Sequence, residues 1–225
     1  MTYWMQTFTG RKIDLLAPKP EDVDIEDIAH ALSMICRFNG HCRDFYSVAE
    51  HSMLVEMLSG ADFGNLPRSL EGPSRYDGTE VRLCGLLHDA AEAYVGDLCT
   101  PVKRSLVHLE GLPAVPSLSR GTPFDDLEDR WLRAIGQRFD LGSSLASTNE
   151  IVKESDDKAL AIEVVALFSP VLMDWWTSRE RPCPGDATIQ CWPPAEARRR
   201  FVHRFRQLTM ARGEKAPWHE IGGPP

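Results

Sequence analysis

The sequence predicts an all-α protein, and three observations support this. Apolar residues recur with helical spacing through most of the chain, helix start and stop signals separate these segments, and strand-like alternation is never sustained. With 225 residues and 43% apolar content, the chain can bury one good core and is too short for two ordinary domains with linkers. We therefore expect one domain over residues 1–225, a bundle of about seven or eight helices.

The N-terminal third supplies the first elements. Residues 1–16, MTYWMQTFTGRKIDLL, have room for one or two short strands or loops, and residues 23–36 place apolar side chains on one stripe, which predicts a helix. Ser47 and Glu50 have the spacing of a capping box, in which Ser47 accepts from the amide of Glu50 and Glu50 reaches back. A second helix should therefore run from there toward Leu58, with His51 in its first turns.

The middle of the chain follows the same logic. Residues 60–77 are rich in Gly, Pro, Asp, Asn and Ser without a period, which predicts a loop. Thr79 can then cap a third helix that runs to about Val95. The motif GLLHDAAEAYVGD lies within this predicted helix, which would carry His88, Asp89 and Glu92.

Four more helices complete the prediction. Thr100 and Thr122 each precede a proline, the pattern of an N-cap followed by Pro at the first helical position. Apolar spacing and the breaker Pro170 define the later segments. The predicted helices span residues 101–108, 123–138, 148–168 and 194–212, and residues 216–225 are expected to form a flexible tail.

Composition narrows the class of protein. The formal net charge of −8 argues against a general nucleic-acid-binding surface, although a local basic pocket for a small anion remains open. The arginines at 198–206 alternate with buried-type phenylalanines, so we expect an ordinary charged outer face there. Six cysteines without a CxxC pair favour reduced thiols and a cytoplasmic location, and neither a signal peptide nor a membrane span is expected.

The predicted third helix carries the chemistry. Residues four apart share one helix face, so His88 and Glu92 should point the same way, with Asp89 only about 100° around. Imidazole and carboxylate together suit Zn, Co, Mn or Fe. Two ligands do not complete a site, and ionisable residues within apolar helices are the natural further candidates: His51, and Asp156 or Asp157.

An HD pair alone occurs often by chance, but here it stands in a longer pattern. The pattern comprises TFTGRKIDLL, DIAHALSMICRFNGHCRDFYSVAEHS, HDAAEAYVGDLCTPVKR, the helix at 153–163 and WPPAEARRRFVHRF. These segments cover nearly the whole chain. They resemble the HD-domain metal-dependent phosphohydrolases, most closely the small 5′-deoxynucleotidases of bacteria and their phages.

The resemblance implies an all-α HD-domain bundle that holds one divalent metal ion, with Zn, Co or Mn favoured and Mg as a further candidate. In that family one ligand lies seven residues before the glutamate matching Glu163, which selects Asp156, with Asp157 as the alternative. The implied metal ligands are His51, His88, Asp89 and Asp156.

The resemblance also assigns roles to the residues around the metal. Glu92 would activate or position the attacking water, Asp97 would belong to the same site and contact the sugar, and Arg37 would orient the phosphate. Phe38 stands where relatives often have tryptophan and would stack on base or sugar, which leaves the base preference open. The implied substrate contacts are Arg37, Phe38, Asp97, Leu98, Cys99 and Thr100. Lys103 is either a phosphate contact or a solvent-exposed helix lysine.

These residues suit phosphoester hydrolysis, because a bound cation lowers the pKa of water toward ~7 and an arginine stabilises charge on phosphate oxygens. We expect a deoxynucleoside 5′-monophosphate as the substrate, no nucleic-acid or membrane partner, and a homo-oligomer, a dimer or larger. One alternative within the same chemistry is release of triphosphate from a deoxynucleoside triphosphate such as dATP. Alternatives from other classes are a nucleotide-binding HD module without catalysis, which the presence of both Glu92 and Asp97 argues against, and nucleic-acid binding through the last helix.

Overall fold

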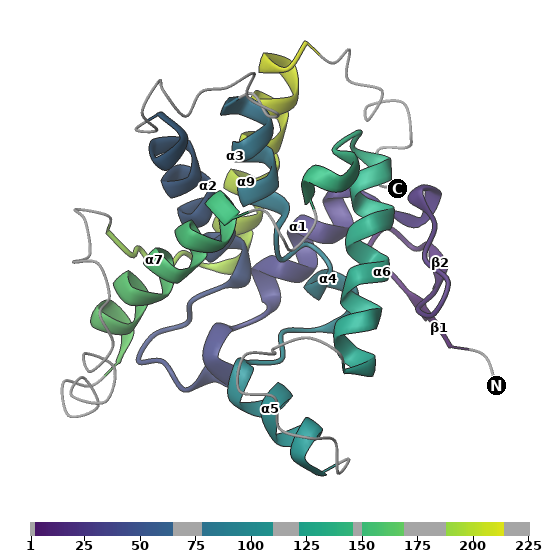
Figure 1. The fold of residues 1–225 in the computed structure, drawn as a ribbon, viewed down its shortest axis with the longest axis horizontal. Helices are drawn as coiled ribbons and strands as arrows, with labels where there is room; N and C mark the ends of the chain where they lie inside the picture. Colours follow the sequence, from purple (N-terminus) through teal and green to yellow (C-terminus); the bar gives the residue numbers. More distant parts are fainter. Residues whose placement is uncertain (1–2, 65–77, 110–121, 146–149, 169–187, 214–225) are drawn as a thin grey trace.

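A computed structural model describes residues 3–64, 78–109, 122–145, 150–168 and 188–213, and these form a mostly helical bundle as the sequence predicts (Figure 1). Two short strands precede the helices. The strands and α-helices are β1 (Trp4–Gln6), β2 (Lys12–Asp14), α1 (Ile25–Met34), α2 (Val48–Gly64), α3 (Gly78–Leu87), α4 (Glu92–Val95), α5 (Thr100–Leu109), α6 (Pro123–Arg138), α7 (Glu150–Leu167) and α9 (Pro194–Ala211). Short 3₁₀ turns lie at Pro20–Asp22, Arg37–Gly40 and Gly142–Leu145.

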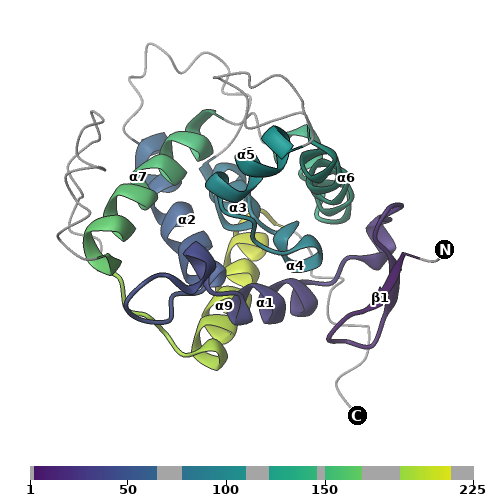
Figure 2. The same cartoon turned by 90° about the horizontal axis from the view of Figure 1, so that it is seen from below.

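Helix α2 lies at the centre of the bundle. It packs against α3 and α7, while α9 packs against α1, and α4 lies between α1 and α6 (Figures 1 and 2). The shared core contains large side chains from five of these helices: Ile28, Leu32, Leu86, Leu87, Trp131, Ile162, Phe201 and Phe205. This packing brings the first turns of α2, the end of α3 and the middle of α7 to one place.

The N-terminal residues form a β-hairpin, which confirms the expected short strands. β1 pairs antiparallel with β2, with Met5 opposite Ile13. Asp27 of α1 accepts hydrogen bonds from the amide and hydroxyl of Thr9 at 2.6 and 2.9 Å, and the indole of Trp131 donates to the carbonyl of Leu15 at 3.2 Å. The hairpin is therefore fixed to both α1 and α6.

Two predicted boundaries were wrong. Helix α2 continues to Gly64, so residues 60–64 are helical rather than part of the predicted loop. Close packing against α3 accompanies this extension, because a Cβ on Gly60 would approach Cδ and Nε of Arg82 to 2.9 Å. Tertiary contact here outweighs the low helix propensity of the glycine-containing segment.

The predicted helix from Thr79 to Val95 is in fact two helices. α3 ends at Leu87, residues 88–91 form tight turns, and α4 begins at Glu92. Within the turn, the amide of Ala90 bonds the carbonyl of Leu87 and that of Glu92 bonds the carbonyl of Asp89, both at 3.0 Å. These three-residue spacings replace the four-residue helical spacing, so His88 and Asp89 do not lie on a regular helix.

The later helices agree with the predictions to within a few residues. α6 begins with a reciprocal capping box, in which Asp125 N donates to Thr122 Oγ1 and Thr122 N donates to Asp125 Oδ2, each at 3.0 Å. α5, α7 and α9 occupy the predicted segments. Pro170 and the expected tail at 216–225 fall outside the described residues. Within the described helices, none combines the length and apolar character needed to cross a membrane.

Candidate metal centre

His51 occupies the first turns of α2, as predicted, and is fully buried. Ser47 caps this end of the helix by accepting the amide of Glu50 at 3.1 Å, but the carboxylate of Glu50 does not complete the expected capping box. It accepts three backbone amides instead, from Gln190, Cys191 and Trp192, at 2.8, 3.0 and 2.7 Å. The segment before α9 is thereby fixed to the helix that carries His51.

His88 and Asp89 reach the same place from the turn after α3. The Nδ1 atom of His88 lies 2.8 Å from the carbonyl oxygen of Gly85, which orients the ring with Nε2 toward α2. The Nε2 atoms of His51 and His88 are 3.2 Å apart. Asp89 Oδ2 lies 3.1 Å from the Nε2 of His88 and 3.4 Å from that of His51.

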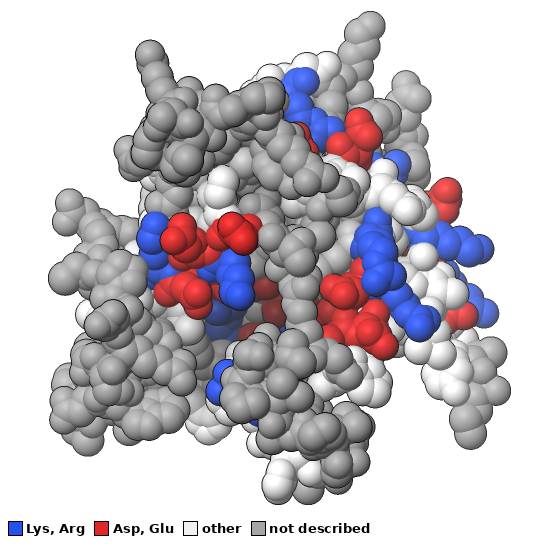
Figure 3. All heavy atoms as spheres, in the orientation of Figure 1, with Lys and Arg blue, Asp and Glu red and all other residues white. Residues whose placement is uncertain are grey.

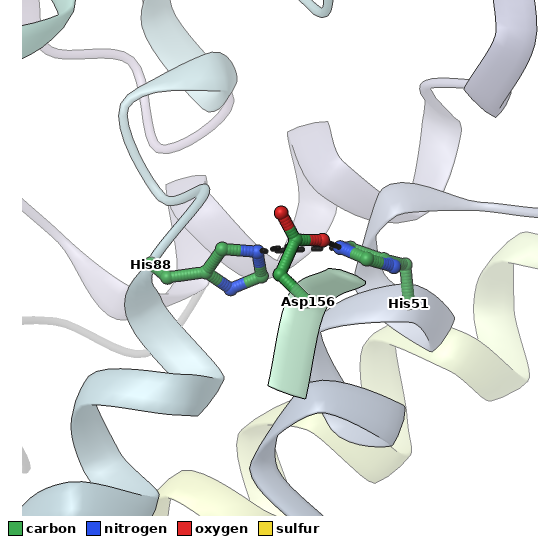
Figure 4. A group of neighbouring side chains, drawn as sticks. All are labelled: His51, His88 and Asp156. Atoms are coloured by element: carbon green, nitrogen blue, oxygen red, sulfur yellow. Dashed lines mark hydrogen bonds and ion pairs between the residues drawn. The ribbon is translucent and has the colours of Figure 1, made fainter. Parts of the chain in front are cut away.

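Asp156 of α7 completes the group, whereas the alternative Asp157 is exposed to solvent. Asp156 Oδ1 lies 3.2 Å from His51 Nε2 and 4.0 Å from His88 Nε2. Figure 4 shows the three side chains pointing toward one another from separate helical segments. The side chain of Asp156 is 42% exposed, so the group is reachable from solvent.

The hydrogen bonds of the two histidines direct one nitrogen of each ring toward the group. The Nδ1 of His88 faces a carbonyl oxygen, which can only accept, so this nitrogen carries the proton. The Nδ1 of His51 likewise faces Glu163 Oε1 at 2.6 Å. With the proton on Nδ1, each ring can direct its Nε2 toward a cation, and the two Nε2 atoms converge with the oxygens of Asp89 and Asp156.

The spacing fits a single metal ion. Ligand atoms that each lie about 2.0–2.2 Å from one ion are necessarily about 3–4 Å from one another. The Nε2 of His51 lies 3.2 Å from the Nε2 of His88 and 3.2 Å from Asp156 Oδ1, the Nε2 of His88 lies 4.0 Å from Asp156 Oδ1, and Asp89 Oδ2 is within 3.4 Å of both imidazoles. The group could therefore hold a metal ion.

Electrostatics at the site favour positive charge. Burial and Arg37 oppose protonation of His51, yet the carboxylates of Glu163, Asp156 and Asp89 raise its pKa well above the usual value. Burial disfavours the ionised form of Asp89, but the two imidazoles hold its pKa well below the usual range. The same field that attracts a proton to these atoms would attract a metal cation.

Arg37 lies beside the candidate ligands, in the 3₁₀ turn after α1. Its Nη1 is 3.5 Å from Asp89 Oδ2 and its Nε is 3.4 Å from Glu163 Oε2, and its side chain is only 12% exposed. An antiparallel bridge between Cys36 and Ser47 holds this turn against the start of α2. Arg37 is therefore placed next to the group, as its expected role requires.

Phe38 follows directly and has an unusual backbone. Its φ is 58°, in the left-handed region that large side chains rarely adopt. Its ring lies 5.4 Å from the Arg37 guanidinium carbon and packs edge-on against Phe168 at 4.9 Å. The strained conformation directs an aromatic ring to the side of Arg37, and its stacking on a base or sugar stays a prediction.

Glu92 begins α4 and is 8% exposed, and its Oε2 has no hydrogen-bond partner among the described residues. Burial, then the neighbouring carboxylates of Asp89 and Asp97, raise its pKa well above the usual value. Asp97 follows Gly96, whose φ of 86° ends α4 and turns the chain back. Burial also raises the pKa of Asp97, although Arg37 opposes this.

The other expected substrate contacts lie further along this loop. Leu98 and Cys99 are half-buried, and Thr100 is exposed at the start of α5. Their contact with a substrate stays a prediction. Lys103 is not the solvent-exposed lysine of one expectation, because both carboxylate oxygens of Glu128 hold its Nζ at 2.9 Å in a partly buried ion pair. Its contact with a phosphate stays a prediction.

The sequence did not indicate two further residues of this centre, Glu163, which contacts His51, and Tyr46, which contacts Glu163. In the sequence, Glu163 indicated only which aspartate lies seven residues before it, and no motif included Tyr46 as a candidate. In the structure Glu163 is fully buried and accepts from His51 and from the hydroxyl of Tyr46 at 2.9 Å. The available signal was an acidic residue on the apolar stripe of α7, seven positions after Asp156, which places both on nearly the same face.

The fold and this centre define an all-α protein with a partly buried histidine–carboxylate group that could hold a metal ion. The chain belongs to the same family as the uncharacterized protein RCAP_rcc00048 of Rhodobacter capsulatus, with 35% identity over 214 residues, 92% of this chain and 96% of that protein. It is also 36% identical over 103 residues to the uncharacterized protein YfdR of Escherichia coli, covering 46% of this chain and 48% of that protein. No family model matches the chain.

Proposed function

We propose that this protein is an HD-domain phosphohydrolase that uses one divalent metal ion, Zn, Co or Mn, to hydrolyse deoxynucleoside 5′-monophosphates to deoxynucleoside and phosphate. The observation that carries the proposal is the convergence of two imidazole Nε2 atoms and two carboxylates beside a buried arginine. A divalent cation held by His51, His88, Asp89 and Asp156 would supply Lewis-acid chemistry and a more acidic water.

The protein's own side chains would bind the substrate and position the attacking water. Arg37 would bind phosphate oxygens, and Asp89 and Glu163 fix its position before substrate arrives. Glu92 has a buried oxygen without a partner among the described residues and a raised pKa, so it is suited to orient a water and accept its proton. Phe38, beside the guanidinium, would pack on the sugar or base.

The choice of a monophosphate over a triphosphate rests on the cations near the site. Further phosphates would need further positive side chains, and Lys103 is already bound by both oxygens of Glu128. Among the described residues around the imidazoles, this leaves Arg37 as the cation in contact with the candidate ligands. The triphosphohydrolase is therefore the second candidate.

Product analysis tests the proposal. Metal-stripped protein is incubated with the four deoxynucleoside mono- and triphosphates, with and without Co²⁺, Mn²⁺, Zn²⁺ or Mg²⁺, and the products are separated by chromatography. We expect metal-dependent release of inorganic phosphate from a monophosphate. Intact triphosphate as the product would transfer the assignment to a triphosphohydrolase, and no turnover with any metal would favour a nucleotide-binding module.

A further inference from the structure

Glu163 is a charged side chain in the interior of the bundle. It lies on α7 with no exposed surface, and its carboxylate contacts two hydrogen-bonding groups and the guanidinium of Arg37. His51 Nδ1 is 2.6 Å and Tyr46 Oη 2.9 Å from Oε1, and Arg37 Nε is 3.4 Å from Oε2. Burial opposes ionisation, but Arg37 and His51 hold the pKa of this carboxyl at about 2.

The contact between Glu163 and His51 determines which nitrogen of the imidazole is free to bind a cation. A carboxylate at Nδ1 binds the proton there, so Nε2 keeps its lone pair for the ligand group. The negative charge also increases the electron-donating strength of the ring. The corresponding partner of His88 is the neutral carbonyl of Gly85, so the two imidazoles are supported unequally.

Glu163 also connects two parts of the site that come from different segments. Asp156 and Glu163 lie on the same helix, seven residues apart, so α7 supplies one candidate ligand and the support for another. Through Oε2 the same carboxylate faces Arg37. Tyr46, fully buried just before α2, contacts Oε1 and limits how the carboxylate can turn.

We infer that Glu163 and Tyr46 are positioning residues, which hold His51 in the tautomer and orientation that bind a divalent cation. Glu163 acts directly on the imidazole, and Tyr46 acts through Glu163. The inference rests on the metal site in the proposed function, but it concerns binding of the cation and not the reaction.

Binding of Co²⁺ to metal-stripped protein tests the inference without any substrate. Co²⁺ affinity is measured by equilibrium dialysis, and its visible absorption reports coordination. Loss of an outer partner of a metal-bound histidine typically costs about 10–100-fold in affinity. We expect Glu163→Gln, which keeps the shape and removes the charge, to weaken Co²⁺ binding by about that factor and to alter the absorption spectrum.

Tyr46→Phe gives a second, milder test. It removes the hydroxyl that donates to Glu163 and keeps the ring. We expect Co²⁺ binding to weaken by about 3–10-fold, because only one hydrogen bond to Glu163 is lost. Because Tyr46 acts through Glu163, its substitution should have little further effect in a protein that already carries Glu163→Gln. Additive effects of the two substitutions would overturn the assigned order of action.

Matched control variants separate positioning from general support of the fold. Glu56→Gln alters another buried carboxylate, which Arg82 and Arg204 hold between α2, α3 and α9. Tyr94→Phe alters another buried tyrosine, whose ring stacks on Trp131 at 3.9 Å. Both should leave Co²⁺ affinity unchanged, whatever they do to thermal stability.

Unchanged Co²⁺ affinity in folded Glu163→Gln and Tyr46→Phe proteins would overturn the inference, as would an equal loss of affinity in the two controls. Absence of Co²⁺ binding by the parent protein would overturn it as well. If the parent protein binds Co²⁺ and Glu163→Gln weakens that binding while no nucleotide is hydrolysed, the proposed function fails and the positioning role stands.

Discussion

At the scale of single residues, Glu92 is buried beside two other carboxylates, Asp89 and Asp97, without a hydrogen-bond partner for one of its oxygens among the described residues. Because its pKa is raised in the folded protein, its ionisation costs stability as the pH rises through that value. The cost is absent below the unfolded pKa of 4.5. The surroundings of Glu92 therefore disfavour its ionised form and lower the stability of the fold at high pH.

Glu92→Gln should therefore separate stability from activity. We expect turnover to fall by about 10²–10⁴-fold because a general base is lost. In the metal-stripped protein, the variant should be more stable than the parent at pH 8, and this advantage should disappear at pH 4. Calorimetric melts at the two pH values and initial rates check this. Full turnover in the variant would show that Glu92 has another role.

Asp89→Ala should behave differently from Glu92→Gln. Asp89 contacts both imidazoles, so its loss should remove the bound metal and activity together, with affinity falling by at least about 100-fold. Elemental analysis of the purified variant measures the metal content. Retention of stoichiometric metal in Asp89→Ala would exclude it as a ligand.

At the scale of elements, the pair between Lys103 and Glu128 links α5 to α6 near the site. Burial raises the pKa of Glu128 to about 7, even though Lys103 opposes this. Since the folded pKa exceeds the unfolded 4.5, this carboxyl favours folding below pH 4.5, and its contribution is lost as the pH rises through about 7.

Lys103→Met removes the cation and leaves the carboxylate. At pH 8 the variant should lose about 1–3 kcal/mol in the free energy of unfolding, the cost of an unsatisfied buried group. At pH 5 the protonated Glu128 needs no cation, so the loss should be smaller. Urea titrations at both pH values measure it, and an equal loss at pH 5 and pH 8 would contradict the assigned cause.

Glu50 of α2 holds the segment before α9 through its backbone amides. Glu50 accepts the amides of residues 190–192, and a glutamine would place donor hydrogens against one of them. Glu50→Gln should lower the free energy of unfolding by about 1–3 kcal/mol and speed hydrogen exchange of these three amides. Exchange as slow as in the parent protein would mean that this contact does not hold the segment.

At the scale of the whole molecule, the charges of the described residues are balanced locally, most clearly along α9. Acidic and basic side chains are interspersed on the surface in Figure 3. The arginines of α9 are paired: Arg198 and Arg206 with Glu26, Arg199 and Arg200 with Glu196, and Arg204 with Glu56. A groove of about 390 Å³ lies between α1 and α9, and its lining includes Arg198, Arg199 and Arg206 together with Glu26.

This balance predicts weak binding to nucleic acid. With a net charge of −8 and paired arginines, we expect no saturable binding of duplex DNA at about 10 μM protein in about 150 mM salt. Fluorescence polarisation at low and high salt measures this. Tight binding with a steep salt dependence would revive the nucleic-acid alternative for the last helix.

Sequence patterning determined the fold class, most helix boundaries and the segments that contribute to the centre. Helical periodicity and caps such as Thr122 are local signals, so α1, α5, α6, α7 and α9 were predictable to within a few residues. The motif and the family resemblance also indicated His51, Asp156 and the His88–Asp89 pair. That pair, however, was expected on one regular helix with Glu92, and the turn at residues 88–91 breaks this helix.

Tertiary structure alone decided how these segments meet. No periodicity in the sequence predicts the break between α3 and α4. Nor does it predict that Glu50 binds residues 190–192, or that Glu163 contacts His51, Tyr46 and Arg37. A local pattern shows which face of a helix is apolar, but the partner of a buried polar group depends on which helices pack together. The sequence thus determined the helices and the chemical types at the centre, while the packing of α2 against α3 and α7 decided which atoms face one another.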